Sequence, residues 1–171
     1  MSIRPLLRFG GAPLLAFVLT VGLAGLASGQ MTPPSVHKHL YSESADPKVD
    51  IAAALKQARA EHKRVILDFG GDWCGDCQVL DIYFHQQPNL DLLDKNFVLV
   101  HVWIGHMDQH VDVAAKYGVP LNRGVPALAV LDASGKVLFA QSTGDFSNMR
   151  GMNVQSVTDF LGKWKPQRKV S

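Results

Sequence analysis

The stretch RVILDFGGDWCGDC, residues 64–77, decides how this chain folds. Its first half, RVILDFG, is short, apolar and β-branched, which is typical of a buried strand. The apolar run breaks at Gly70-Gly71, and the residues from Cys74 onward follow a helical pattern. Residues 64–77 therefore predict a strand, a glycine break and the start of a helix, with Cys74 and Cys77 at that start.

Cys74 and Cys77 are the two cysteines of the chain, and two residues separate them. At a helix N-terminus, unpaired backbone N–H groups and the positive end of the helix dipole favour the thiolate of Cys74, which is the attacking species in disulfide exchange. Cys77 lies one turn further on and deeper in the helix. We therefore interpret Cys74 as a nucleophile and Cys77 as the cysteine that resolves a mixed disulfide. A bridge between them closes almost no loop, so it is poorly explained as a structural crosslink.

Residues 1–29 are predicted to be a signal peptide. Arg4 and Arg8 precede a nearly unbroken apolar run over residues 12–27, and Ala27-Ser28-Gly29 offers a cleavage site. An uncleaved membrane anchor is the alternative, but the run is shorter than the roughly 20 residues that span a bilayer. We therefore expect a periplasmic or secreted protein, with no membrane attachment after cleavage. Such compartments are oxidising.

Charge and composition exclude some classes of partner. The net charge is +2, and without Arg4 and Arg8 the 15 remaining basic residues equal the 15 acidic ones. Nothing in this balance indicates a nucleic-acid partner. The 47% of apolar residues is ordinary for a globular core.

Residues 30–48 are polar and proline-containing, and they are predicted to be a linker or N-terminal arm before a domain at 49–165 and a basic tail at 166–171. Asp50 is the expected cap of the first helix. After that helix we expect strands and helices in the order strand, helix, short helix, strand, helix, hairpin and helix, at residues 64–70, 74–83, 89–95, 97–104, 109–117, 127–131 with 136–141, and 154–164. This order predicts the α/β class, with a central mixed sheet covered by helices on both faces.

The motif Asp68-Phe-Gly-Gly-Asp-Trp73-Cys74-Gly75-Asp76-Cys77, with Gly124-Val125-Pro126-Ala127 downstream, resembles the thioredoxin superfamily. The resemblance covers residues 50–164 and is strongest to periplasmic thioredoxin-like proteins, including the soluble redox domain of the thiol–disulfide interchange protein. It implies a thioredoxin fold and a thiol–disulfide oxidoreductase that needs no cofactor. Its partners would be protein disulfide substrates and a thiol protein that donates electrons. We expect a monomer.

The same resemblance implies roles for single residues. Pro126 would be a cis proline beside the disulfide, Val125 would offer its backbone to substrate, and Trp73 would be a substrate platform. Gly118-Val119-Pro120 is a second copy of the Gly-Val-Pro tripeptide, but only Pro126 precedes an apolar strand directly. Asp68 would be the buried carboxylate beneath Cys77, where loss of hydration favours its protonated form and suits it to proton transfer.

Two residues depart from the family pattern. Gly75-Asp76 replaces the common Gly-Pro, and Gln78 stands where lysine is frequent. An added carboxylate and a missing cation both oppose a thiolate at Cys74, and destabilising the reduced form makes a disulfide less oxidising. We therefore treat Gly75 and Asp76 as tuning residues that favour a reductant.

The histidines leave one alternative open. His106-Met107 and His110 bring copper-type ligands together in sequence, and His85 and His101 could approach the cysteines. A copper-handling protein that uses Cys74, Cys77 and histidine is therefore the second interpretation, although we predict no metal. Surface histidines, and for His101 a hydrogen-bonded core residue that approaches Asp68, are the simpler explanations.

Overall fold

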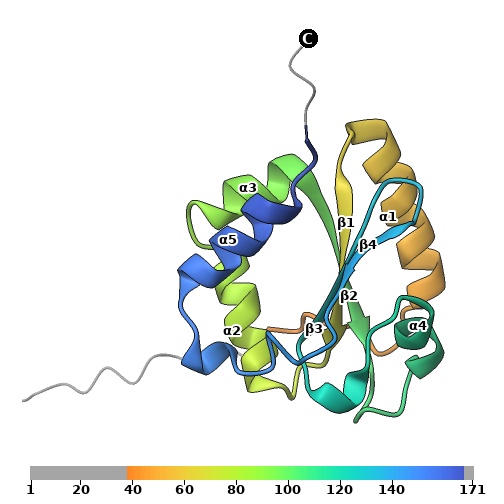
Figure 1. The fold of residues 1–171 in the computed structure, drawn as a ribbon. Coiled ribbons are helices and arrows are strands. Elements are labelled where there is room, and N and C mark those ends of the chain that lie inside the picture. The colour runs from red at the N-terminus through yellow and green to blue at the C-terminus, as the bar shows by residue number, and fades with distance from the viewer. Residues whose placement is uncertain (1–37, 168–171) are drawn as a thin grey trace, which may run out of the picture. The chain divides into compact units, whose positions relative to one another are not determined.

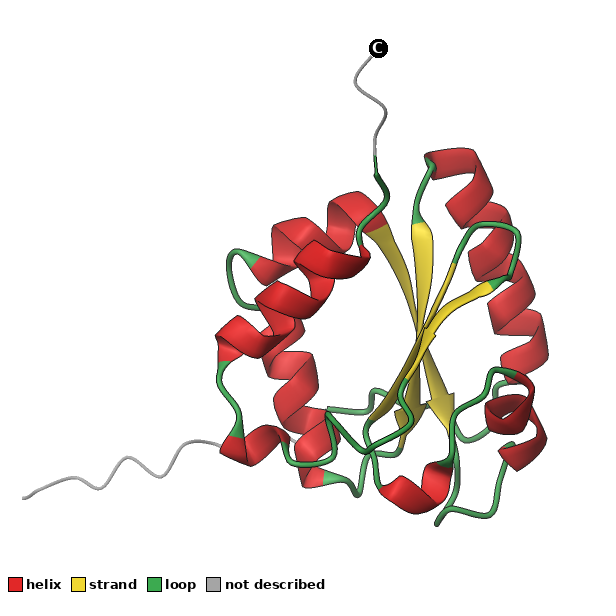
Figure 2. Cartoon of the chain, in the orientation of Figure 1, coloured by secondary structure: helices red, strands yellow, loops and turns green. Residues whose placement is uncertain are grey.

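The computed structural model describes residues 38–167 (Figures 1 and 2). Its sheet has the strand order β2-β1-β3-β4, with bounds β1 (Arg64–Gly70), β2 (Phe97–Trp103), β3 (Ala127–Leu131) and β4 (Val137–Ala140). β1 pairs in parallel with β2 and antiparallel with β3, and β3 pairs antiparallel with β4. The sheet is therefore mixed, as the order of sequence elements predicts.

Helices cover both faces of this sheet (Figure 1). One face carries α1 (Pro47–Glu61) and α4 (Val111–Lys116), and the other carries α2 (Gly75–Phe84), α3 (Asn89–Asn96) and α5 (Val154–Trp164). Two short 3₁₀ helices, η1 (Leu121–Arg123) and η2 (Met149–Gly151), lie in the loops. The predicted α/β class is confirmed.

The strand β1 divides the core into two clusters because alternate side chains point to opposite faces of a sheet. Val65, Leu67 and Phe69 belong to the cluster under α1 and α4. Ile66 belongs to the cluster under α2, α3 and α5. Asp68 lies two residues after Ile66 in the strand, so its side chain points to the same face of the sheet. Its carboxylate therefore lies on the side of the sheet that α2 covers.

Two helix starts differ from the sequence prediction by more than one residue. Asp46, not Asp50, caps α1: its side chain accepts a hydrogen bond from the Lys48 N–H, and Pro47 occupies the first turn. The helix thus begins two residues before the predicted domain boundary. The helix expected over residues 109–117 is shorter at its start, because the Ile104 carbonyl accepts N–H groups from residues 107, 108 and 109 and winds that segment into turns.

The predicted signal peptide lies outside the described residues, as do residues 168–171 of the predicted basic tail. Within residues 38–167, no helix combines the length and the apolar character that crossing a membrane requires.

Candidate active site

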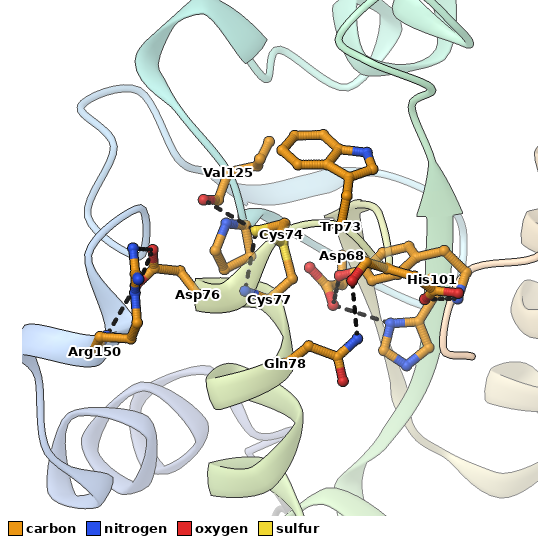
Figure 3. Close-up of a disulfide and its surroundings, with 12 residues drawn as sticks. Asp68, Trp73, Cys74, Asp76, Cys77, Gln78, His101, Val125 and Arg150 are labelled. Carbon is orange, nitrogen blue, oxygen red and sulfur yellow. Dashed lines mark hydrogen bonds and ion pairs between the residues drawn. A yellow bond between two sulfur atoms is a disulfide. The ribbon is translucent and has the colours of Figure 1, made fainter. Parts of the chain in front are cut away.

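Cys74 and Cys77 form a disulfide at the first turn of α2 (Figure 3). Cys74 is the N-cap residue, and its sulfur accepts a hydrogen bond of 3.1 Å from the Cys77 N–H. Their Cα atoms are 5.2 Å apart. Cys74 is 6% exposed and Cys77 is fully buried. As the spacing predicts, Cys74 is the more exposed of the two cysteines.

The loop before β3 faces Cys74. The Val125 carbonyl oxygen lies 3.6 Å from the Cys74 sulfur, and the Val125–Pro126 peptide bond is cis. The other cis bond within residues 38–167 precedes Pro88, so the copy of the tripeptide at Pro120 does not share the geometry. Val125 and Pro126 therefore lie where the resemblance to the family places them, beside the disulfide.

Asp68 is buried beneath the disulfide, with 1% of its surface exposed. The parallel pairing of β1 with β2 sets Asp68 opposite His101, whose Nδ1 lies 3.0 Å from Asp68 Oδ2. The Tyr41 hydroxyl donates to the same oxygen at 2.7 Å. Oδ1 is buried and has no hydrogen-bond partner within residues 38–167. Figure 3 shows Asp68 between the disulfide and His101.

Burial and the Asp68 charge shift the pKa values of the two groups that contact Asp68, in opposite directions for His101 and in the same direction for Tyr41. Burial alone lowers the pKa of His101, but the hydrogen bond and the negative charge of Asp68 outweigh it and raise that pKa above its ordinary value. Burial raises the pKa of Tyr41 well above its usual value, and Asp68 raises it further. The Tyr41 hydroxyl therefore keeps its proton and remains a hydrogen-bond donor at physiological pH.

Asp76 does not stand as an isolated charge beside Cys74. Its carboxylate accepts hydrogen bonds from the Arg150 backbone N–H at 2.9 Å and from the guanidinium at 3.0 and 3.2 Å (Figure 3). Burial raises the pKa of Asp76, but the contacts with Arg150 outweigh it and lower that pKa below its ordinary value. Arg150 thus supplies a cation that the sequence interpretation lacked, and it balances the carboxylate on which that interpretation relied. A Cβ atom placed on Gly75 would make ordinary van der Waals contact with the same guanidinium.

Trp73 is 47% exposed next to the disulfide. Its indole N–H donates to the Gly105 carbonyl at 2.7 Å, and its ring stacks on His106 with centroids 5.6 Å apart. The segment after β2 therefore supports the tryptophan from one side. A fixed, half-exposed ring suits the predicted role of a substrate platform.

The N-terminal arm belongs to the site, which the sequence interpretation missed. Tyr41 is buried in the core cluster under α1, and it reaches Asp68 from a segment predicted to be a linker or N-terminal arm. The adjacent pair Leu40-Tyr41 in an otherwise polar stretch is the sequence feature that could have revealed it. Gln78, noted only for the lysine it replaces, bonds to the backbone of Lys38. No sequence pattern points to Arg150.

The histidines of the copper alternative have separate partners. His85 lies against Asp81, His101 against Asp68, His106 on Trp73 and His110 beside Trp103. Within residues 38–167, no three His, Cys, Asp or Glu side chains gather in a group that could hold a metal ion. The arrangement therefore gives the copper interpretation no support beyond the sequence pattern.

Comparison with known families matches residues 46–133 to the thioredoxin-like family, about half of the chain. The chain belongs to the thioredoxin-like family. A crystal structure of a disulphide isomerase from Xylella fastidiosa is 34% identical, covers 74% of this chain and 96% of that chain, and has a TM-score of 0.70. A thioredoxin from Mycoplasma genitalium is 31% identical over 46% of this chain and 68% of that protein.

The thiol:disulfide interchange protein DsbD of Pseudomonas fluorescens is 24% identical over 96% of this chain, but the match spans only 29% of DsbD. The chain therefore corresponds to less than a third of that relative. With a Cys-x-x-Cys disulfide at the helix start, this thioredoxin-like protein is a thiol–disulfide oxidoreductase. The suspected membership of the thioredoxin superfamily is confirmed.

Proposed function

We propose that the protein is an exported reductant of protein disulfides, working through the Cys74–Cys77 dithiol. The observation that carries the proposal is the disulfide at the N-terminus of α2, between the Val125–Pro126 loop and the buried Asp68. A buried carboxylate beneath the pair opposes nearby thiolates, and this makes the disulfide less oxidising. The signal peptide predicted at residues 1–29 would direct the protein to the periplasm or outside the cell.

The reaction cycle begins with the reduced enzyme. The Cys74 thiolate attacks one sulfur of a substrate disulfide that docks along Val125 and Pro126, and the other substrate sulfur leaves as a thiolate. Asp68 accepts the proton of the Cys77 thiol, and the Cys77 thiolate then attacks Cys74. The bond between Cys74 and the substrate breaks, and the second substrate sulfur leaves and takes up the proton held by Asp68. The first substrate thiolate takes up a proton from solvent. The substrate gains two electrons and two protons, and the enzyme keeps the Cys74–Cys77 disulfide.

A dithiol protein that donates electrons completes the cycle. It attacks the oxidised pair by the same exchange chemistry and leaves as a disulfide, so no cofactor enters the balance. The similarity to part of DsbD supports a place among proteins that exchange thiols and disulfides with one another. Protein disulfides are the proposed substrates, and the proposed acting form is a monomer.

The equilibrium reduction potential tests the direction of electron flow. The domain is equilibrated in glutathione and dithiothreitol buffers, and the thiols are trapped and counted. We expect a value near or below about −250 mV, because thioredoxin lies at roughly −270 mV. A value between about −120 and −180 mV, the range of oxidants and isomerases, would overturn the proposed reductant role.

Isomerisation is the second candidate function, and the similarity to the Xylella fastidiosa disulphide isomerase favours it. The two functions differ in their reaction products. A reductant converts insulin disulfides to thiols with a stoichiometric donor, whereas an isomerase restores the activity of scrambled ribonuclease without net reduction. Efficient recovery of scrambled ribonuclease, together with slow insulin reduction, would favour the isomerase.

A further inference from the structure

Residues 38–41 are hydrogen-bonded to residues on both sides of the cysteine motif. The Gln78 side chain, directly after Cys77, accepts from the Lys38 N–H at 3.2 Å and donates to the Lys38 carbonyl at 3.1 Å. The Asp72 carboxylate, two residues before Cys74, accepts from the N–H groups of Leu40 and Tyr41 at 2.8 and 3.1 Å. These contacts fix the backbone of the arm at the place where Tyr41 turns inward.

Tyr41 reaches the immediate surroundings of the Cys77 sulfur. The side chain is 3% exposed. A Cβ atom placed on Gly70 would lie 2.6 Å from the Tyr41 hydroxyl oxygen and 2.7 Å from the Cys77 sulfur. The phenol and the sulfur therefore meet over Gly70, where any side chain larger than hydrogen would collide with both.

The two oxygens of Asp68 are not equivalent. Oδ2 has two partners, the Tyr41 hydroxyl at 2.7 Å and the His101 Nδ1 at 3.0 Å. Oδ1 has none within residues 38–167, although it is buried. Oδ1 is therefore the oxygen that remains open to receive a proton, because no protein group within residues 38–167 donates to it. The contacts from Tyr41 and His101 thus determine which oxygen is free.

We propose that Tyr41 is a positioning residue for the exchange reaction: its hydroxyl holds Asp68 by Oδ2 and leaves Oδ1 to receive the proton of Cys77. This inference rests on the proposed role of Asp68 as the base. The hydroxyl also stabilises the carboxylate relative to the protonated acid, since a hydrogen bond to the charged form favours that form. The other ionisable groups that act on Tyr41 are Asp72 and Asp81, and both are acidic.

The test is the pH dependence of mixed-disulfide resolution. A peptide is joined to Cys74 by a disulfide, and its release by Cys77 is followed in single turnover for the natural chain, Tyr41→Phe and Asp68→Asn. Tyr83→Phe is the matched control, because it removes the hydroxyl of a half-buried tyrosine at the far end of α2, which donates to the Met152 carbonyl. Thermal unfolding of each variant shows that it is folded.

We expect Tyr41→Phe to move the acid limb of the release rate to higher pH by about one unit, so that release below the midpoint slows roughly tenfold. At high pH the rates converge. Tyr83→Phe keeps the natural profile, and Asp68→Asn loses the acid limb.

Two results would overturn the inference in distinguishable ways. If Tyr41→Phe follows the natural profile, or slows release equally at every pH, Tyr41 does not position the base, and the role of Asp68 stands. If Asp68→Asn keeps the acid limb, the proposed base is wrong, and the role of Tyr41 fails with it.

Discussion

Single residues around Asp68 differ in how they respond to pH. The Tyr41 phenol keeps its proton, because burial and the Asp68 charge raise its pKa well above its usual value. His101 changes its charge nearer to neutrality, and its imidazolium form pairs with a buried carboxylate at 3.0 Å. The site therefore contains one constant donor and one donor whose charge depends on pH.

His101 makes the stability of the oxidised protein depend on pH. Because the pKa of His101 is raised in the folded state, its contribution is fully present below the ordinary histidine value of about 6.5 and is lost as pH rises through the raised value. We expect the free energy of unfolding in urea to fall over this window in the natural chain. His101→Gln should remove that slope, whereas a substitution at the exposed His62 should keep it. An unchanged slope in His101→Gln would contradict the prediction.

At the level of elements, the start of α2 is held from two sides. The arm binds Asp72 and Gln78, and the loop of η2 binds Asp76 through Arg150. The Arg150 side chain is 70% exposed, so solvent weakens the ion pair. The positive charge of Arg150, although weakened by solvent, still acts on the first turn of α2, where Cys74 forms its thiolate.

Arg150 and Asp76 should shift the reduction potential in opposite directions. Arg150→Gln leaves the Asp76 carboxylate unpaired, opposes the Cys74 thiolate and lowers the potential by about 10–20 mV. Asp76→Asn leaves the cation unpaired and raises the potential by a similar amount. The double variant should have a reduction potential close to that of the natural chain. A double-mutant cycle measures this coupling. Single substitutions that shift the potential in the same direction would contradict this coupling.

The sequence predicted those elements whose patterns are local. β1 has the predicted bounds because a β-branched run ends at paired glycines, and α2 begins at Gly75, one residue after the predicted start at Cys74, which caps it. The closing helix α5 also keeps its predicted bounds. Asp68 and the two cysteines lie in one continuous motif, so the centre of the site was visible as well.

Tyr41 and Arg150 were missed because their contacts are long-range. Tyr41 is 27 residues from Asp68, and Arg150 is 74 residues from Asp76. A single sequence carries no periodicity that links such positions. The pairing of Asp68 with His101, suggested only by approximate alignment, became definite through the register of two parallel strands.

At the level of the whole molecule, the described chain is a sheet with two cores, and the arm fills part of one of them. Tyr41 packs in the same buried cluster as Leu67, Phe69 and Cys77. Residues 38–46 are therefore not only a connecting segment, because they close the core beside the disulfide.

Tyr41→Ala should destabilise the oxidised protein by about 3 kcal/mol, since removing a buried aromatic side chain loses its burial and leaves a cavity. Val49→Ala, at a position that is 63% exposed in the next helix, should change stability by less than about 0.5 kcal/mol. Urea midpoints of the two variants measure the difference. Equal midpoints would show that the arm does not contribute to the core.

The attachment of the arm at Asp72 and Gln78 matters for anyone who shortens this protein. A version started at Pro47 would keep every strand and every helix of residues 38–167, and its circular dichroism would look native. It would nevertheless lack the hydroxyl on Asp68 and both backbone anchors beside the cysteines. Such a trimmed domain would keep its secondary structure but lose the stability that Tyr41 contributes, and its kinetics would mislead, so the shortest version that keeps these contacts begins no later than Lys38.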